Sequence, residues 1–122
     1  MVESNAKLFV SAVGVAPKHV VEKLHANGIF YMNLVGHPKH VVKACAAGAD
    51  IICAQGSEAG GHTSEIPTRS VLDIDAANYK ILTASEKSVL VPACADLVKQ
   101  YVSPLTGEPV SLVAAGGICD GK

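Results

Sequence analysis

The sequence predicts an α/β fold built from βα units with a parallel sheet, and three observations lead to this prediction. Short apolar segments typical of buried strands occur near residues 8–13, 30–35, 50–54 and 110–115. Segments with apolar residues at helical spacing follow the first two strands and precede the last one. The connections between these segments are short. Short connections of this kind favour right-handed crossovers within a single parallel sheet.

The first two units repeat one pattern. Residues 13–21, Val-Gly-Val-Ala-Pro-Lys-His-Val-Val, return as residues 35–42, Val-Gly-His-Pro-Lys-His-Val-Val. Each proline suits the first turn of a helix, where its missing N–H costs nothing. Gly28 and Gly48 suit the ends of the two helices, because glycine readily adopts the left-handed conformation found there. The repeat therefore predicts two successive helices that each connect two strands.

Each predicted helix carries an apolar stripe. The stripes consist of Val20, Val21 and Leu24 in the first helix and of Val41, Val42 and Cys45 in the second. A third helix is expected within residues 89–101, with Pro92 in its first turn. A turn-rich connection over residues 103–109 then leads to the last strand.

Residues 69–87 do not follow this pattern. They are more polar than their surroundings, and Ser70-Val71-Leu72 is echoed by Ser88-Val89-Leu90. A long connection within compact βα units is either functional or extraneous. We interpret 69–87 as an insertion within a domain fragment that spans residues 1–122.

The stretch from Gly48 to His62 carries the strongest functional signal. It reads as a buried strand followed by a glycine-rich loop with one histidine, Gly-Ala-Asp-Ile-Ile-Cys-Ala-Gln-Gly-Ser-Glu-Ala-Gly-Gly-His. In parallel α/β folds, ligands bind at the carboxyl ends of the strands. Glycines allow the backbone to approach a ligand closely, and an imidazole can act as a base near neutral pH. The sequence therefore predicts that the chemistry lies in this loop.

Composition excludes several classes of partner. The 122 residues are 49% hydrophobic and 17% charged, with a net charge of −1, so we expect neither nucleic-acid nor membrane binding. The four cysteines lack metal-ligand spacing, which favours structural thiols and no metal site. The amino-terminal residues do not resemble a signal peptide. We expect a cytoplasmic protein, with the mitochondrial or peroxisomal matrix as alternatives.

The loop and its surroundings resemble the nitronate monooxygenase family, formerly called 2-nitropropane dioxygenases. Residues 49–63 carry its signature, and further similar stretches follow the family's order at residues 31–40, 65–68, 88–96 and 113–118. The resemblance implies an aldolase-type, FMN-binding (βα)8 TIM barrel, of which this chain holds about four of the eight units. It also implies FMN-dependent oxidation of alkyl nitronates, such as propionate 3-nitronate, with molecular oxygen.

The resemblance also implies roles for individual residues. His62 matches the family's catalytic base. The remaining matches are residues that contact FMN or lie near its phosphate: Gln55, Gly60, Gly61, Gly116 and Gly117. A glutamine side chain can donate to and accept from the polar edge of a flavin. Glycine N–H groups suit a phosphate.

Alternatives remain at this stage. The chain could be a truncated, non-catalytic barrel fragment that associates with itself through open sheet edges, or a related FMN-dependent enoyl reductase. His37 and His40 could share a metal, although a helix-start or solvent role fits their spacing better. We expect His19 and His25 to face water, and Glu58 is either a second acid–base group or a locally bonded loop carboxylate.

Overall fold

The computed structural model describes residues 3–56 and 90–116, which form four strands and three helices. The predicted insertion at 69–87 lies outside the described residues. In chain order the elements are β1 (Leu8–Ser11), α1 (Lys18–Ala26), β2 (Phe30–Val35), α2 (Pro38–Ala46), β3 (Ile51–Gln55), α3 (Leu90–Val98) and β4 (Ser111–Ala115). The predicted α/β fold with four strands is confirmed.

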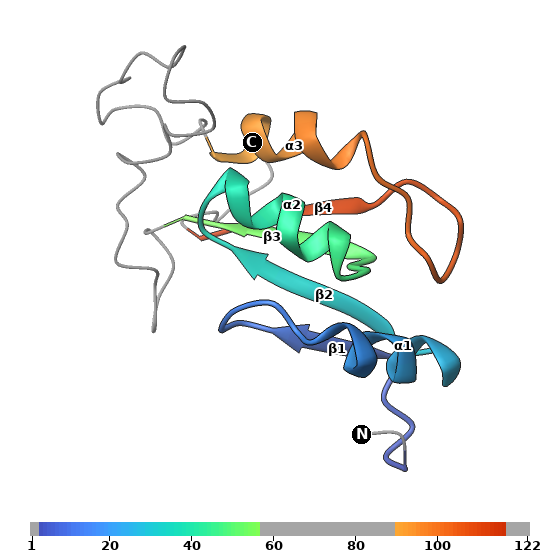
Figure 1. The fold of residues 1–122 in the computed structure, drawn as a ribbon. Coiled ribbons are helices and arrows are strands. Elements are labelled where there is room, and N and C mark those ends of the chain that lie inside the picture. Colours follow the sequence, from blue (N-terminus) through green and yellow to red (C-terminus); the bar gives the residue numbers. More distant parts are fainter. Residues whose placement is uncertain (1–2, 57–89, 117–122) are drawn as a thin grey trace.

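The four strands form one parallel sheet in sequential order, β1-β2-β3-β4 (Figure 1). In register, Met32 of β2 pairs with Ile51 of β3, and Ile51 pairs with Ser111 of β4. Sequential order places each new strand beside the previous one, as in the wall of a barrel. A doubly wound sheet would instead reverse its strand order at a switch point.

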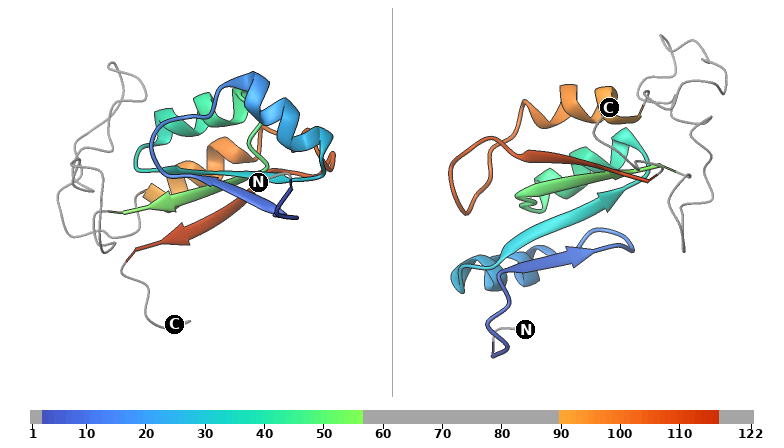
Figure 2. Two further views of the ribbon diagram at one scale, coloured as in Figure 1. Left: turned by 90° about the horizontal axis from the view of Figure 1, so that it is seen from below. Right: turned by 180° about the vertical axis from the view of Figure 1, so that it is seen from behind.

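All three helices cover the same face of the sheet (Figure 2). The helix α1 packs on β2, α2 packs on β2 and α3, and α3 packs on β3 and β4. The buried core lies between this helical layer and the sheet, with Tyr31, Val41, Ile52 and Cys94 fully enclosed. The opposite face of the sheet carries no helix among the described residues.

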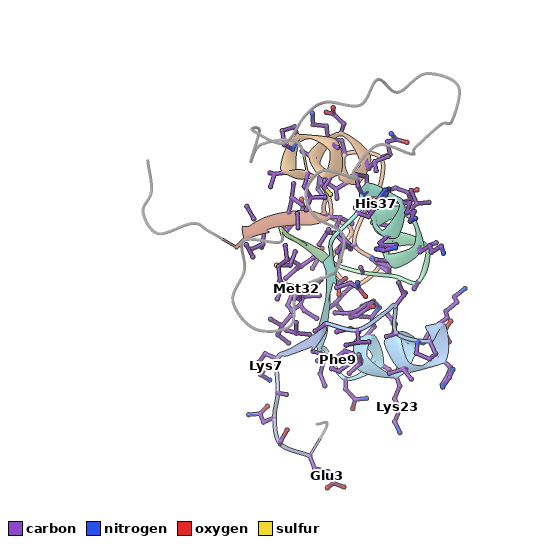
Figure 3. The ribbon with its side chains drawn as sticks, turned by 90° about the vertical axis from the view of Figure 1, so that its left-hand side faces the viewer. Glu3, Lys7, Phe9, Lys23, Met32 and His37 are labelled. Atoms are coloured by element: carbon purple, nitrogen blue, oxygen red, sulfur yellow. The ribbon has the colours of Figure 1, made fainter. Side chains whose placement is uncertain are left out.

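Side chains alternate between the two faces of the sheet. Phe9 and Tyr31 point toward the helices and stack with ring centroids 5.9 Å apart. Met32 lies on the face away from the helices, and Figure 3 shows it on the side of β2 opposite to that of Phe9. Each strand therefore has one set of residues in the core and a second set on the helix-free face.

The predicted helix boundaries are confirmed by the cap geometry. Pro38 is the first residue of α2, as predicted, whereas Pro17 is the N-cap of α1 and lies one residue before its first turn. Gly28 and Gly48 follow the C-caps with φ of 67° and 101°, the left-handed region in which a Cβ would be strained. At Gly48 an added Cβ would also lie 3.2 Å from the Val21 side chain. The positive φ explains why glycine ends both helices, and the close contact is a second reason at Gly48 alone.

One predicted stripe is partly wrong. In α2 the buried residues are Pro38, Val41 and Ala44, whereas Val42 is 41% exposed. The helix presents the face of Val41 and Ala44 to β2 and α3, and Val42 lies about 100° further around the helix than Val41. No helix of the described residues is long and apolar enough to cross a membrane.

Candidate functional site

The candidate site lies at the edge of the sheet where the parallel strands β3 and β4 both end. Gln55, the last residue of β3, pairs in register with Ala115, the last residue of β4. The Gly56 N–H then donates a hydrogen bond of 3.2 Å to the Ala115 carbonyl. This bond continues the ladder by one residue and brings Gly56 beside Gly116. Two of the sequence-predicted cofactor residues, Gln55 and Gly116, are therefore neighbours.

Gln55 faces the side of the sheet that has no helix. It shares a face with Ile51 and Cys53, because side chains on one strand alternate, and Ile51 pairs with Met32 on the same face. Gln55 is half-buried. Its amide carries one acceptor oxygen and two N–H donors. At the otherwise apolar carboxyl end of this face, the Gln55 side chain is suited to the polar edge of a planar ligand.

Gly116 adopts a backbone conformation that favours glycine. Its φ is 92°, which costs an L-residue about 1–2 kcal/mol. A glycine at the carboxyl end of a strand lets a ligand approach the main chain without meeting a Cβ. This geometry fits the expectation that the segment lies near a phosphate.

Four predicted site residues lie outside the described residues: Gly60, Gly61, His62 and Gly117. Their roles as catalytic base and cofactor contacts stay predictions. Gly56 is the last described residue before this loop, and it lies at the carboxyl edge of β3. The chain therefore enters the predicted catalytic loop at the edge where parallel α/β proteins bind ligands.

His37 lies at the same edge of the sheet, after β2. It is the N-cap of α2, and its Nδ1 accepts a hydrogen bond of 3.1 Å from the Lys39 N–H. This bond leaves the proton of the neutral ring on Nε2. Of the helix-start and solvent roles expected for His37, the helix-start role is confirmed, and the residue is only 3% exposed.

His40 lies close to His37, with ring centroids 5.9 Å apart. Burial lowers the pKa of His40, and the positive charges of Lys39 and Lys43 lower it further. A lower pKa means that the neutral form of the His40 ring is favoured. Within residues 3–56 and 90–116, no group of three His, Cys, Asp or Glu side chains could hold a metal ion.

A buried polar network around Tyr31 was not predicted from the sequence. The Tyr31 hydroxyl donates to Asn33 Oδ1 and accepts a 2.9 Å bond from the Ala16 N–H. Burial raises the pKa of Tyr31, partly offset by its bonds to Ala16 and Ser11. The network fastens the connection between β1 and α1 onto β2. One feature of the sequence could have indicated this network: two polar residues, Tyr31 and Asn33, occupy alternate positions of an otherwise apolar strand.

A second unpredicted cluster lies at the opposite edge of the sheet, where β3 begins. The Asp50 carboxylate accepts hydrogen bonds from His25 Nε2 at 2.9 Å, from the Tyr31 N–H at 2.8 Å and from Ser103 Oγ. The expectation that His25 faces water is wrong, because its side chain is 15% exposed and pairs with Asp50. His19 is exposed, as expected.

The Asp50 cluster has a structural role. It joins α1, the start of β2 and the connection between α3 and β4. In (βα)8 barrels the amino-terminal edge of the strands contributes stability, whereas the carboxyl edge holds the chemistry. Asp50, His25 and Ser103 are thus assigned to the scaffold, and Gln55 and Gly116 to the candidate site.

The described cysteines are structural thiols. Cys94 is fully buried, Cys53 is buried and Cys45 is half-buried. Burial raises the pKa of all three thiols, to about 11 for Cys45 and Cys94. A thiol with a raised pKa is a poor nucleophile at neutral pH. Cys119 lies outside the described residues.

Comparison with known proteins shows which family this chain resembles. The family described as nitronate monooxygenase matches along residues 1–122. A nitronate monooxygenase of Neurospora crassa is 35% identical over 105 residues, which cover 86% of this chain and 22% of that protein. A Rhodococcus jostii protein is 35% identical over 78 residues, which cover 62% of this chain and 22% of that protein. Its name is (3aS,4S,5R,7aS)-5-hydroxy-7a-methyl-1-oxo-octahydro-1H-indene-4-carboxyl-CoA dehydrogenase.

A solved structure supports the same fold. A point mutant of FabK from Thermotoga maritima superposes with a TM-score of 0.67 at 25% sequence identity. The superposition covers 98% of this chain and 30% of that one. The chain thus spans about a quarter of the length of the curated relatives it matches. The sequential parallel sheet is a part of a TIM barrel, as predicted.

Proposed function

The chain belongs to the nitronate monooxygenase family, and we propose that it forms part of an FMN-dependent enzyme that oxidises alkyl nitronates with molecular oxygen. Propionate 3-nitronate is the proposed type of substrate. The observation that carries this proposal is the position of Gln55. It is the one polar side chain at the carboxyl end of the helix-free face of β2, β3 and β4 in the part of the chain that the structure describes.

We assign cofactor binding to residues at the carboxyl edge of the sheet. Gln55 would bond the polar edge of the flavin through its amide. Gly116 and Gly117 would lie near the phosphate, since Gly116 already has the open backbone geometry that suits such an approach. Gly60 and Gly61 would complete the contacts from the loop after β3. These residues would hold the cofactor, and the redox chemistry, transfer of electrons from the substrate to oxygen, would be supplied by the bound FMN.

His62 is the proposed catalytic base. In a neutral state it would remove the α-proton of a nitroalkane, and in the protonated state it would bind the negatively charged nitronate. The apolar residues beside Gln55 on the helix-free face would keep water from the reacting atoms. The protein would thus supply orientation, a proton acceptor and a dry surface.

One observation favours a second candidate. The relative from Rhodococcus jostii is named as a dehydrogenase of a carboxyl-CoA compound. Oxidation of an acyl-CoA by the same site is therefore the alternative activity. The two candidates differ in their small-molecule substrate, which a direct comparison of both substrate classes would separate.

The test is an oxygen-consumption assay of the purified chain, supplied with FMN and propionate 3-nitronate. We expect oxygen consumption that depends on both additions. The role of His62 is tested in the same assay with a nitroalkane in place of the nitronate, because the nitronate has already lost its α-proton. With the nitroalkane, His62→Asn should lower the kcat by about 100-fold or more, the usual contribution of a general base. His19→Asn is the matched control, because His19 is exposed on α1. Equal activity of the two variants would remove His62 from its proposed role.

A further inference from the structure

The helix-free face of the sheet, called the open face below, is apolar and free of charge. Its members follow from the strand register, in which paired residues point to the same side. They are Leu8, Val10, Phe30, Met32, Leu34, Ile51, Cys53, Gln55, Ser111, Val113 and Ala115. Gln55 and Ser111 are its polar members, and they lie at opposite ends of β3 and β4.

Large apolar side chains of the open face are in contact with solvent. Leu8 is 40% exposed, and Val10 and Val113 are each 43% exposed. Phe30 is 37% exposed. A contiguous apolar surface of this kind on a folded chain is characteristic of an interaction site.

Both edges of the same sheet are open in the described residues. β1 pairs with β2 alone, and β4 pairs with β3 alone. An open edge presents unpaired N–H and C=O groups, which readily pair with a strand of another chain. The surface therefore offers two edges for strand pairing in addition to an apolar face.

These features determine the shape of the partner. A sheet of four parallel strands, in sequential order and with its helices on one face, is half of an eight-stranded barrel. The missing half must itself have four parallel strands running the same way, an apolar inner face and helices outside. A second copy of this chain has all of these properties.

We propose that two copies of this chain associate through their open faces and close into an eight-stranded barrel. A two-fold axis along the barrel keeps all eight strands parallel, because rotation about that axis does not reverse their direction. It places β4 of each copy beside β1 of the other, so that both open edges become paired. An interface of this kind is closed and self-complementary.

The association would also complete the candidate site. Because the strands run in the same direction in both copies, the two Gln55 side chains lie at the same mouth of the barrel. Each copy then supplies the four strands that the other copy lacks around this site. The association depends on the shape and apolar character of the sheet, and it holds whether or not the chain binds flavin.

The test is the mass of the purified 122-residue chain, measured by light scattering during size-exclusion chromatography and by sedimentation equilibrium over a dilution series. We expect twice the mass of one chain. Val10→Lys and Val113→Lys each place a charge on the open face. Each should weaken the association by about 100-fold or more, because burying an unpaired ammonium group is costly.

Val42→Lys is the matched control. Val42 is 41% exposed on α2, and therefore has nearly the exposure of Val10 while lying on the helical layer. It should leave the dimer intact. Circular dichroism would establish that each variant folds, and hydrogen exchange of the wild-type chain would show protection of β1 and β4 that is lost on dilution.

Each result decides the proposal. A monomeric wild-type chain, an open series of larger oligomers, or a dimer that both open-face lysines leave intact would overturn it. An equal effect of all three lysines would also overturn it, because the contact would then not be specific to the open face. If the lysine variants do not fold, the wild-type mass and the dilution-dependent exchange of β1 and β4 decide alone.

Discussion

Replacing Asp50 by alanine should remove a large part of the chain's stability. The Asp50 side chain is 1% exposed and accepts three hydrogen bonds, from His25, Ser103 and the Tyr31 main chain. The donors come from α1, from the connection before β4 and from the start of β2. The carboxylate therefore joins three separate segments, and Ser103 is 53 residues from Asp50 in sequence.

The size of the effect follows from these contacts. The substitution leaves the Tyr31 N–H and the Ser103 hydroxyl without their acceptor in a buried place, and each unpaired buried donor costs about 1–3 kcal/mol. His25 is 15% exposed, so water can replace part of its bond. We expect the free energy of unfolding to fall by about 3–5 kcal/mol, which is within the range for two unpaired buried donors. The total free energy of unfolding of a small domain is about 5–15 kcal/mol.

The assay is urea unfolding of the wild-type chain, Asp50→Ala and Asp96→Ala, followed by circular dichroism. Asp96 is the matched control, because it pairs with Lys99 at the same distance of 2.9 Å but is 78% exposed. Its replacement should cost less than about 1 kcal/mol. Similar losses in the two variants would refute the assignment of Asp50 to the scaffold.

Two further predictions concern the core. Tyr31→Phe should lower the free energy of unfolding by about 1–2 kcal/mol, because the Ala16 N–H and Asn33 lose a buried hydroxyl partner; an unchanged urea midpoint would contradict the network. Burial raises the pKa of Cys45 and Cys94 from 9.0 to about 11, so the folded state favours neutral thiols. Their contribution to stability is complete below pH 9 and is lost as the pH rises toward 11. The urea concentration at the unfolding midpoint should therefore decrease as the pH is raised from 9 to 11. A midpoint that does not change with pH over this range would count against buried thiols.

The order of the strands and helices could be predicted because local sequence determines it. Pro17 and Pro38 start helices, and Gly28 and Gly48 end them through the backbone conformation that each allows. The short connections then leave a parallel, sequential sheet as the simplest arrangement. The carboxyl-edge position of Gln55 follows directly from this order.

The polar networks could not be predicted, because they depend on packing between distant residues. His25 and Asp50 are 25 residues apart, and their atoms meet only because α1 packs on β2 with His25 beside Gly48, just before β3. A histidine on an amphipathic helix gives no sign of such a partner. The error at Val42 has a similar origin, since the contact with α3 decides which side of α2 is buried.

The central claim is that the carboxyl edge of this sheet holds a flavin. An FMN titration of the purified chain, followed by flavin fluorescence and absorbance, tests it most directly. We expect saturable binding that Gln55→Ala weakens about 10-fold, the value of a hydrogen bond of about 1.4 kcal/mol. Gln100→Ala, at an exposed position beyond α3, should bind FMN like the wild-type chain. A spectrum of FMN that the chain leaves unchanged at every concentration would contradict the claim and favour a barrel fragment without a cofactor.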